Sequence, residues 1–331
     1  MSFTPVPQRP ARLNRSELAV PGSNRRFLEK AAADPQVDVV FLDLEDAVAI
    51  DKKAEARKNV IEAISDLDWG EKSVSVRING MDTPYCYRDV IDILEQASDR
   101  LDLIMLPKVG RPEDVYAIDF LITQVESARG RAKRVGLELL IESAMGMMHI
   151  DAIAAASPRN ESLHFGAADY AASTKADTVQ IGGPNPRYAV LTDADEAGHR
   201  QVHWGDMWHY ALNRLVIAAR ANGLRPIDGP FGDFSDEAGF TYHANRAMVL
   251  GCEGKWAIHP SQVPLCNTLF SPSQDELKKA YAVLDAMEQA RAKGQGAAAL
   301  DGKLIDLASI RQAEAMVAKH EAAGGTRVGA D

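Results

Sequence analysis

The chain has 331 residues, of which 46% are hydrophobic, and carries a formal net charge of −10. That length and apolar content suffice for one large core with an added element, or for two modest domains. The acidic balance disfavours long-range attraction to nucleic acid or anionic lipid, and no apolar run reaches the roughly eighteen residues that span a membrane. We therefore expect neither nucleic acid nor a membrane as a partner.

The cysteines and the first residues indicate the compartment. Cys86, Cys252 and Cys266 are far apart in the sequence and form no C-x-x-C pair. This argues against a disulfide framework or a Cys-ligated zinc site and favours a reducing compartment. Residues 1–16, taken as an N-terminal segment, lack the apolar stretch of a secretion signal. We expect a cytoplasmic protein.

Short apolar runs rich in β-branched residues recur along the chain, and each precedes a polar loop and a stretch with helical spacing. The eight runs are 17–22, 39–46, 73–80, 103–110, 137–143, 163–169, 224–229 and 255–260. Helical spacing is clear at 51–64 and 111–128. Strict alternation of strand and helix predicts a parallel sheet whose strands are buried on both faces.

Eight such units in about 260 residues predict a (β/α)8 TIM barrel, an α/β fold, over residues 17–270. A doubly wound open sheet is the alternative, because it has the same local pattern. The count of eight and the lack of G-x-G-x-x-G after the first run favour the barrel.

Two segments do not fit the repeat. Residues 170–204 form a long connection after the sixth run, and long connections in compact domains are often functional. Residues 271–331 predict a C-terminal helical extension or lid, with one helix capped by Ser271 or Ser273 and a final helix over about 304–323.

Ionisable residues end every predicted strand from the second onward. In a barrel the carboxyl ends of the strands converge on one face, where catalytic groups lie. Singly, Lys108 and Asp228 are more typical of surface, ion-pairing or turn residues, and His259 could equally be an ordinary loop histidine or a functional one. Their coincidence at seven strand ends favours a shared site. The residues are Asp43, Glu45, Asp46, Arg77, Lys108, Glu142, Asp169, Asp228 and His259.

The charges at these ends indicate the chemistry. Glu142 and Asp169, on adjacent strands, would repel each other unless a cation lay between them, and a few hard oxygen ligands suit Mg²⁺. With Arg77, such a cation would stabilise an enolate or an α-keto acid, which suits aldol-type carbon–carbon cleavage. A Schiff-base aldolase would instead need a desolvated lysine, for which Lys108 and Lys255 are the candidates.

Several segments carry a family resemblance. "LAVPGSN", "FLDLEDAVAIDKKAEAR", "VRING", "LPKVG", "IESAMG", "FGAADYAAS" and "GKWAIHPSQ" resemble the citrate lyase β-subunit / HpcH-type aldolase family of Mg²⁺-dependent acyl-CoA lyases. "GGPNPRYAVLTDADEAGHRQVHWGD", "GLRPIDGPFGDFSD" and "LDGKLIDLASIRQAEA" are similar to its malyl-CoA-cleaving members. The resemblance implies reversible cleavage of (S)-malyl-CoA to acetyl-CoA and glyoxylate, with β-methylmalyl-CoA as a second substrate that gives propionyl-CoA.

The same resemblance implies roles for the residues that match. Glu142 and Asp169 would hold Mg²⁺, with Mn²⁺ as an alternative, and Arg77 would polarise the thioester carbonyl. The backbone at Ala168 and Asp169 would contact glyoxylate. Asp301 would act as acid or base in a neighbouring subunit's site, which implies a homo-oligomer, a trimer or hexamer, with a shared active site.

The resemblance also implies where coenzyme A binds as part of the substrate. The contacts would come from the "VPGSN" turn and its helix near the CoA phosphates, and from "AIHP" along the channel. The residues are Ala19, Asn24, Lys30, Ile258 and Pro260. Relatives can carry a basic residue where Asn24 stands, so Arg25 and Arg26 are alternative contacts.

The acidic end of the second run has a supporting role in this interpretation. Asp43 and Glu45 would orient Arg77 and Lys108 or accept hydrogen bonds from metal-bound water. The alternatives are a malyl-CoA thioesterase or citramalyl-CoA lyase on the same scaffold, or a non-catalytic acyl-CoA-binding protein. Retention of Arg77, Glu142, Asp169 and Asp301 together argues against the last.

Overall fold

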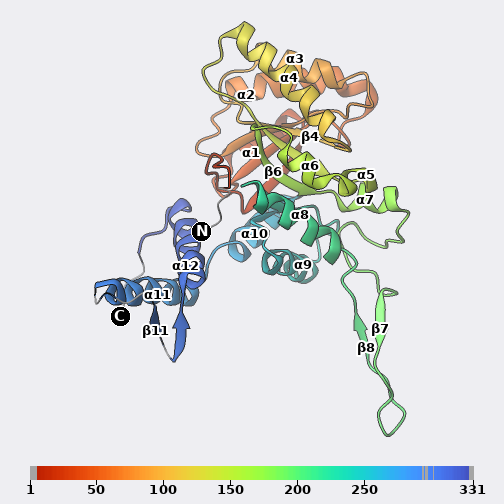
Figure 1. The fold of residues 1–331 in the computed structure, drawn as a ribbon. Coiled ribbons are helices and arrows are strands. Elements are labelled where there is room, and N and C mark those ends of the chain that lie inside the picture. The colour runs from red at the N-terminus through yellow and green to blue at the C-terminus, as the bar shows by residue number, and fades with distance from the viewer. Residues whose placement is uncertain (1–5, 293, 295–296, 301, 328–331) are drawn as a thin grey trace. The chain divides into compact units, whose positions relative to one another are not determined.

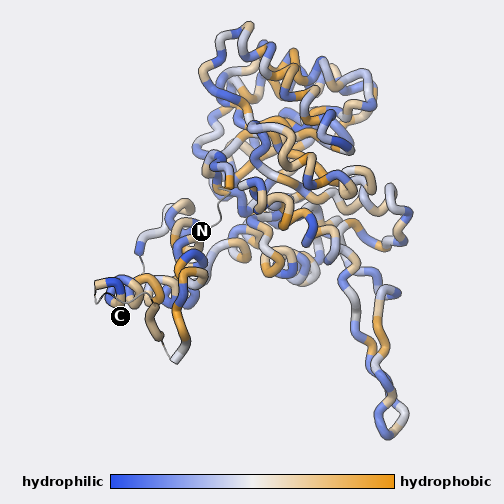
Figure 2. The backbone as a smooth tube through the Cα atoms, in the orientation of Figure 1, coloured by the Kyte–Doolittle hydropathy of each residue, from blue (hydrophilic) through white to orange (hydrophobic). Residues whose placement is uncertain are grey.

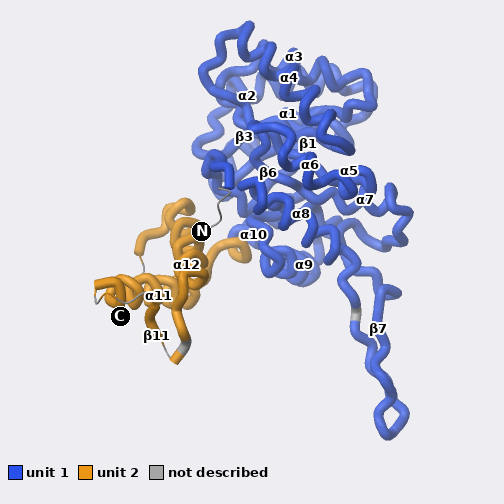
Figure 3. The backbone as a smooth tube through the Cα atoms, viewed as in Figure 1, with its two compact units in different colours: residues 1–267 blue, residues 268–331 orange. Residues whose placement is uncertain are grey.

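The computed structural model describes residues 6–292, 294, 297–300 and 302–327. The chain divides into two compact units, Met1–Asn267 and Thr268–Asp331, which Figure 3 shows in different colours.

Eight parallel strands of the first unit close into a barrel, as the sequence predicts (Figure 1). Around the barrel the order is β1-β10-β9-β6-β5-β4-β3-β2. Glu17 of the first strand pairs with Val39 on one side and with Trp256 on the other, which excludes the open sheet. The strands are β1 (Ser16–Pro21), β2 (Val39–Asp43), β3 (Ser73–Arg77), β4 (Leu103–Leu106), β5 (Gly136–Ile141), β6 (Asn160–Phe165), β9 (Arg225–Asp228) and β10 (Gly254–Ala257).

Helices follow the strands in the expected alternation. The helix predicted at 111–128 begins with Pro112 in its first turn and ends at Gly130, which adopts the left-handed conformation with φ 62°. The helices of this unit are α1 (Arg25–Ala33), α2 (Lys53–Asp66), α3 (Cys86–Gln96), α4 (Pro112–Arg129), α5 (Ala144–Met148), α6 (Ile150–Ala155), α7 (Ala167–Thr174), α8 (His209–Ala221) and α9 (Glu237–Leu250), with 3-10 turns η1 (Ile50–Lys52) and η2 (Pro260–Gln262); α10 (Val263–Leu269) crosses into the second unit.

Several strands are shorter than the apolar runs that predict them. The run 39–46 continues past the end of β2 at Asp43, and Leu44 is fully buried although it lies outside the strand. The run 103–110 likewise continues four residues past β4, which ends at Leu106. The apolar pattern therefore predicts burial, and burial extends into the loops at the carboxyl ends of the strands.

The long connection after β6 contains elements that the sequence analysis did not predict. Its first part is α7, and its second part is an antiparallel hairpin of β7 (Ala189–Leu191) and β8 (Val202–Trp204). The hairpin projects from the barrel in Figure 1, and its tip is hydrophilic in Figure 2. Val190 and Leu191 are exposed. Because these apolar residues face solvent, the sequence shows no alternation of buried and exposed positions here, and the two strands were not predicted.

The barrel interior holds an apolar cluster and a buried polar cluster. The apolar cluster consists of Phe41, Met105, Leu140, Ile227 and Trp256, against which Ala19 packs. The polar cluster consists of Glu17, Ser75, Glu138, Ser162 and His164, all buried. The sequence analysis treated these strands as continuously apolar and did not predict the polar cluster.

The second unit is a pair of helices with a small hairpin. Its elements are α11 (Gln274–Ala292), β11 (Ala298–Leu300), β12 (Lys303–Ile305) and α12 (Leu307–Ala322), and Met287, Ile305 and Ile310 form its core. Ser273 caps α11: its Oγ accepts from Glu276 N, and Glu276 accepts from Ser273 N at 2.8 Å. Asp301 lies outside the described residues.

Cys86, Cys252 and Cys266 are free, buried thiols. Among the helices of the described residues, none is both long enough and apolar enough to cross a bilayer.

Lys255 and Asp228 form an ion pair inside the barrel wall. The Lys255 ammonium donates to Asp228 Oδ2 at 2.6 Å and to the carbonyl of Gly229 at 2.7 Å, and both charged side chains are buried. Asp228, one of the predicted strand-end residues, therefore has a structural partner.

Replacing Lys255 with methionine should lower the free energy of unfolding by about 3–5 kcal/mol, because Asp228 would be left charged and buried without its partner. Urea denaturation followed by circular dichroism measures the loss. The double variant Lys255→Met with Asp228→Asn should recover much of it. A single-variant loss below about 1 kcal/mol would show that the pair is not a buried ion pair in solution.

Candidate active site

A pocket of about 400 Å³ opens at the carboxyl ends of the barrel strands. It is lined by eight of the residues predicted for the site. They are Ala19, Asp43, Asp46, Arg77, Glu142, Ala168, Asp169 and Ile258.

Arg77, at the end of β3, is held by two carboxylates. Its Nε and one terminal nitrogen donate to the two oxygens of Asp43 at 2.7 and 2.6 Å, and its other terminal nitrogen lies 3.0 Å from Glu45 Oε2. Burial alone would lower the pKa of Arg77, but Asp43 and Glu45 outweigh it and raise the pKa. The guanidinium is therefore charged and fixed in orientation where it meets the pocket.

Asp43 also shapes the turn that follows β2. It accepts the backbone N–H groups of Glu45 at 2.9 Å and Ala47 at 3.1 Å. Burial by itself would raise the pKa of Asp43, yet the charge and hydrogen bonds of Arg77 hold it below its usual range. An ionised aspartate at the end of a buried strand is thus stabilised by Arg77 and by the turn.

Glu45 lies between two cations. Lys108 Nζ is 2.9 Å from Glu45 Oε1, opposite the contact with Arg77. Burial raises the pKa of Glu45, and the two cations oppose this in part. Lys108 has a left-handed backbone, with φ 53°, which directs its N–H to Glu142 Oε1 at 2.8 Å. Lys108 therefore connects the two carboxylates through its side chain and its backbone.

Glu142, at the end of β5, is a buried carboxylate with excess negative charge around it. Its side chain is 3% exposed, and burial followed by repulsion from Glu45 and Asp169 raises its pKa to about 8. Gly166 leaves room for it, since a Cβ there would lie 2.4 Å from Glu142 Oε2. Asp169, in the first turn of α7, lines the same pocket.

This donor set fits a divalent cation. Repelling carboxylates that face open pocket space offer hard oxygen ligands and leave positions for water or substrate, as Mg²⁺ requires. A bound cation would also remove the repulsion that raises the pKa of Glu142.

The two lysines considered for a Schiff base are both engaged. Burial alone would lower the pKa of Lys108, but its contact with Glu45 raises it, so the amine is protonated. Lys255 is held by Asp228 inside the wall. A Schiff base needs a neutral amine facing the substrate; Lys108 is protonated, and Lys255 is not among the residues that line the pocket.

Five further predicted residues in the described part of the chain do not line the pocket. Asn24 caps α1, accepting from Phe27 N at 3.3 Å, and Lys30 is exposed on that helix. Pro260 begins η2. Glu45 lies behind Arg77 and is not among the residues that line the pocket. His259 stacks on Phe234, with centroids 4.8 Å apart.

The sequence analysis missed several residues of the pocket. Phe41 and Trp256 form an aromatic surface beside Arg77, and Ile181 and Pro230 are further lining residues. Phe41 precedes Asp43 by two positions, so the alternation of a strand could have placed it on the inner face. Ile181 comes from the long connection, where no periodic pattern marks it.

The closed parallel barrel carries an arginine–carboxylate site at the carboxyl ends of its strands. Barrel enzymes of this fold have their active sites at that face. The chain belongs to the HpcH/HpaI aldolase/citrate lyase family, which matches residues 15–260. This confirms the predicted fold and family.

Similar proteins cover nearly the whole chain. The L-malyl-CoA/beta-methylmalyl-CoA lyase of Cereibacter sphaeroides is 54% identical over 97% of this chain and 99% of its own. The (3S)-malyl-CoA thioesterase of the same species is 34% identical over 93% and 95%. The crystal structure of CitE from Mycobacterium tuberculosis in complex with magnesium, acetoacetate and coenzyme A is 25% identical, with a TM-score of 0.68, and covers 93% of this chain and 98% of that one.

Proposed function

We propose that the protein is a Mg²⁺-dependent acyl-CoA lyase that reversibly cleaves (S)-malyl-CoA to acetyl-CoA and glyoxylate. β-Methylmalyl-CoA, giving propionyl-CoA and glyoxylate, is the second substrate. The observation that carries the proposal is the pocket in which Arg77, held by Asp43, lies with the mutually repelling Glu142 and Asp169. The relative that is 54% identical supports the choice of substrates.

In this proposal Glu142 and Asp169 hold Mg²⁺, with Mn²⁺ as an alternative. When bound, the cation polarises substrate oxygens and offsets negative charge. Arg77 donates N–H groups to the thioester carbonyl oxygen, on which charge grows as the carbon–carbon bond breaks. Asp43 and Glu45 keep the guanidinium oriented, so that little reorganisation is needed during the reaction.

The hydroxyl of the malyl group loses its proton to a base, its oxygen forms the aldehyde carbonyl of glyoxylate, and the bonding pair passes to the acetyl-CoA enolate. Protonation of the enolate carbon gives acetyl-CoA. The backbone at Ala168 and Asp169 is proposed to contact the glyoxylate carboxylate.

Coenzyme A is proposed to extend from the pocket along β1, α1 and β10. Ala19 and Ile258 line the pocket, and α1, with Asn24 and Lys30, begins directly after β1 at the same end of the barrel. Arg25 and Arg26 are adjacent cations for the phosphates. Pro260, at the start of η2, completes the proposed channel.

Asp301 is proposed as the acid or base, acting in a neighbouring subunit of a homo-oligomer, a trimer or hexamer. Asp301→Asn should lower kcat about 10²-fold or more with Mg²⁺ and CoA binding little changed, because the group acts in proton transfer. Steady-state kinetics and calorimetry measure the two effects. Mixed oligomers of Asp301→Asn and Arg77→Ala subunits should regain activity, and a failure to regain any would argue against sharing between subunits.

The proposed cytoplasmic location is supported by the free, buried thiols. It can be checked by fractionation of cells that express the protein, in which we expect it in the cytosolic fraction.

Product analysis separates the candidate functions. Incubation with (S)-malyl-CoA and Mg²⁺ should release glyoxylate and acetyl-CoA, with no malate. A malyl-CoA thioesterase, favoured by the relative that is 34% identical, would release malate and free CoA. Faster cleavage of citramalyl-CoA than of malyl-CoA would make that compound the substrate. Binding of malyl-CoA without any product would indicate a non-catalytic protein.

A further inference from the structure

Arg77 is supported by an aromatic surface as well as by carboxylates. Its Cζ atom lies 5.8 Å from the centre of the Phe41 ring and 5.7 Å from that of the Trp256 ring. The two rings are in contact, with centroids 4.5 Å apart and planes tilted by 48°. Asp43 therefore fixes the edge of the guanidinium, and the rings restrict its tilt.

Trp256 is in turn anchored by His164 of β6. The indole Nε1–H donates to His164 Nδ1 at 2.9 Å, and both side chains are buried. Because an indole N–H can only donate, Nδ1 must accept, and the ring proton is assigned to Nε2. Nε2 lies 2.8 Å from Ser162 Oγ, which can accept a hydrogen bond from the Nε2–H and itself donates to Glu138 Oε1 at 3.2 Å; Glu138 Oε1 is 3.5 Å from Nε2.

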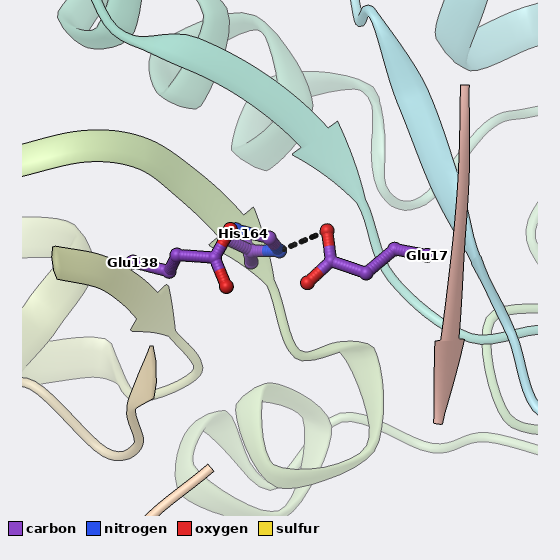
Figure 4. Close-up of side chains that lie close together, drawn as sticks. All are labelled: Glu17, Glu138 and His164. Atoms are coloured by element: carbon purple, nitrogen blue, oxygen red, sulfur yellow. Dashed lines mark ion pairs between the residues drawn. The ribbon is translucent and has the colours of Figure 1, made fainter. Parts of the chain in front are cut away.

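Glu17, Glu138 and His164 have the residue types of a metal site, with potential ligand atoms within 4.8 Å of one another. Their arrangement argues against one. The two carboxylates approach the imidazole from opposite sides (Figure 4), Glu17 at 3.7 Å from Nδ1 and Glu138 at 3.5 Å from Nε2. With Nδ1 accepting from Trp256 and Nε2 protonated, the ring has no lone pair left for a cation.

We propose that Trp256 is a positioning residue for Arg77, and that His164 fixes the indole in the orientation this requires. The inference rests on the proposed function, because Arg77 is the group assigned to the thioester oxygen. A small misplacement of such a group lowers the rate of the chemical step with little effect on substrate binding.

The contact between Trp256 and His164 can be tested without turnover. The chain has four tryptophans, so few indole N–H signals appear in a proton–nitrogen correlation spectrum, and Trp256→Phe identifies the relevant one. His164→Leu removes the acceptor and should move this signal upfield. His164→Asn keeps an oxygen near the position of Nδ1 and should leave the signal closer to that of the unaltered protein.

The positioning role is tested by kinetics on the same variants. Trp256→Phe keeps an aromatic ring but loses the N–H, and should lower kcat about tenfold while KM for malyl-CoA changes less than about twofold. His164→Leu should do the same, and His164→Asn should recover most of kcat. The double variant Trp256→Phe with His164→Leu should be no slower than either single variant, because both changes break one contact.

Trp69→Phe is the matched control. Trp69 is also buried, and its Nε1–H donates to the carbonyl of Ala63 at 3.0 Å, so the substitution removes the same kind of bond elsewhere in the barrel. It should leave kcat unchanged. Wild-type kcat in Trp256→Phe, an equal loss in Trp69→Phe, or an unmoved indole signal in His164→Leu would each overturn the proposal. If the unaltered protein cleaves no acyl-CoA, the proposed function fails, and the spectrum still decides whether His164 holds Trp256.

Discussion

Arg77→Lys is expected to lower kcat by about 10³-fold, because an ammonium cannot bond both oxygens of Asp43 and also present directed N–H groups to the pocket. The positive charge beside Asp43 and Glu45 is retained, so the fold should survive. Arg77→Met would leave Asp43 buried without its ion-pair partner and Glu45 with Lys108 alone, at a cost of about 3–5 kcal/mol in stability. The comparison of kcat and the unfolding midpoint in the lysine variant therefore separates chemistry from folding.

Arg57→Lys is a suitable control for this experiment. Arg57 Nε donates to the buried Asp89 at 2.7 Å in a pair between α2 and α3, away from the pocket lining. The Arg57→Lys variant should lose about as much stability as Arg77→Lys does, and it should keep the kcat of the unaltered protein. If Arg77→Lys retained kcat within about threefold of the unaltered protein, Arg77 would have no directed role in the transition state.

Glu142→Gln should stabilise the metal-free protein and abolish its response to Mg²⁺. The pKa of Glu142 is about 8 in the folded protein, above its value in the unfolded chain, so ionisation opposes folding. Between the two pKa values the folded state holds a proton that the unfolded state has lost, and stability falls as pH rises. The shift corresponds to at most about 5 kcal/mol at pH 8 and above.

The measurement is thermal unfolding in EDTA from pH 6 to pH 9, repeated with Mg²⁺. The unaltered protein should lose stability towards pH 8 and regain it on addition of Mg²⁺, whereas Glu142→Gln should show little of either effect. Asp102→Asn is a comparison variant with the opposite expected effect on stability. Burial alone would raise the pKa of Asp102, but Lys133, the N–H of Val74 and Arg12 hold that pKa below its usual range. Removal of this carboxylate should therefore destabilise the folded protein. A Glu142→Gln variant that still gains stability from Mg²⁺ would remove Glu142 from the metal site.

The closed barrel and much of the pocket could be predicted from the sequence for one physical reason. Parallel strands bring their carboxyl ends to one face, so ionisable residues that follow apolar runs must lie near one another. Asp43, Arg77, Glu142 and Asp169 meet in the pocket for this reason. The same reasoning overestimated Asp228, since position at a strand end does not reveal that Lys255, on the next strand, is its partner.

Other features of the structure leave no recognisable pattern in the neighbouring sequence. The hairpin of β7 and β8 exposes its apolar residues, so no burial pattern accompanies it. The contact of Trp256 with His164 depends on two strands 92 positions apart in sequence. The left-handed backbone of Lys108, which brings its N–H to Glu142, also escaped prediction because that conformation is uncommon for lysine.

The most direct test of the central claim is glyoxylate release from (S)-malyl-CoA, measured before EDTA, after EDTA, and after Mg²⁺ is restored. The account predicts release with Mg²⁺, loss of release in EDTA, and recovery on restoration, because Glu142 and Asp169 are assigned to the cation. Glyoxylate release that continues undiminished in EDTA, or its absence with Mg²⁺ present, would contradict it.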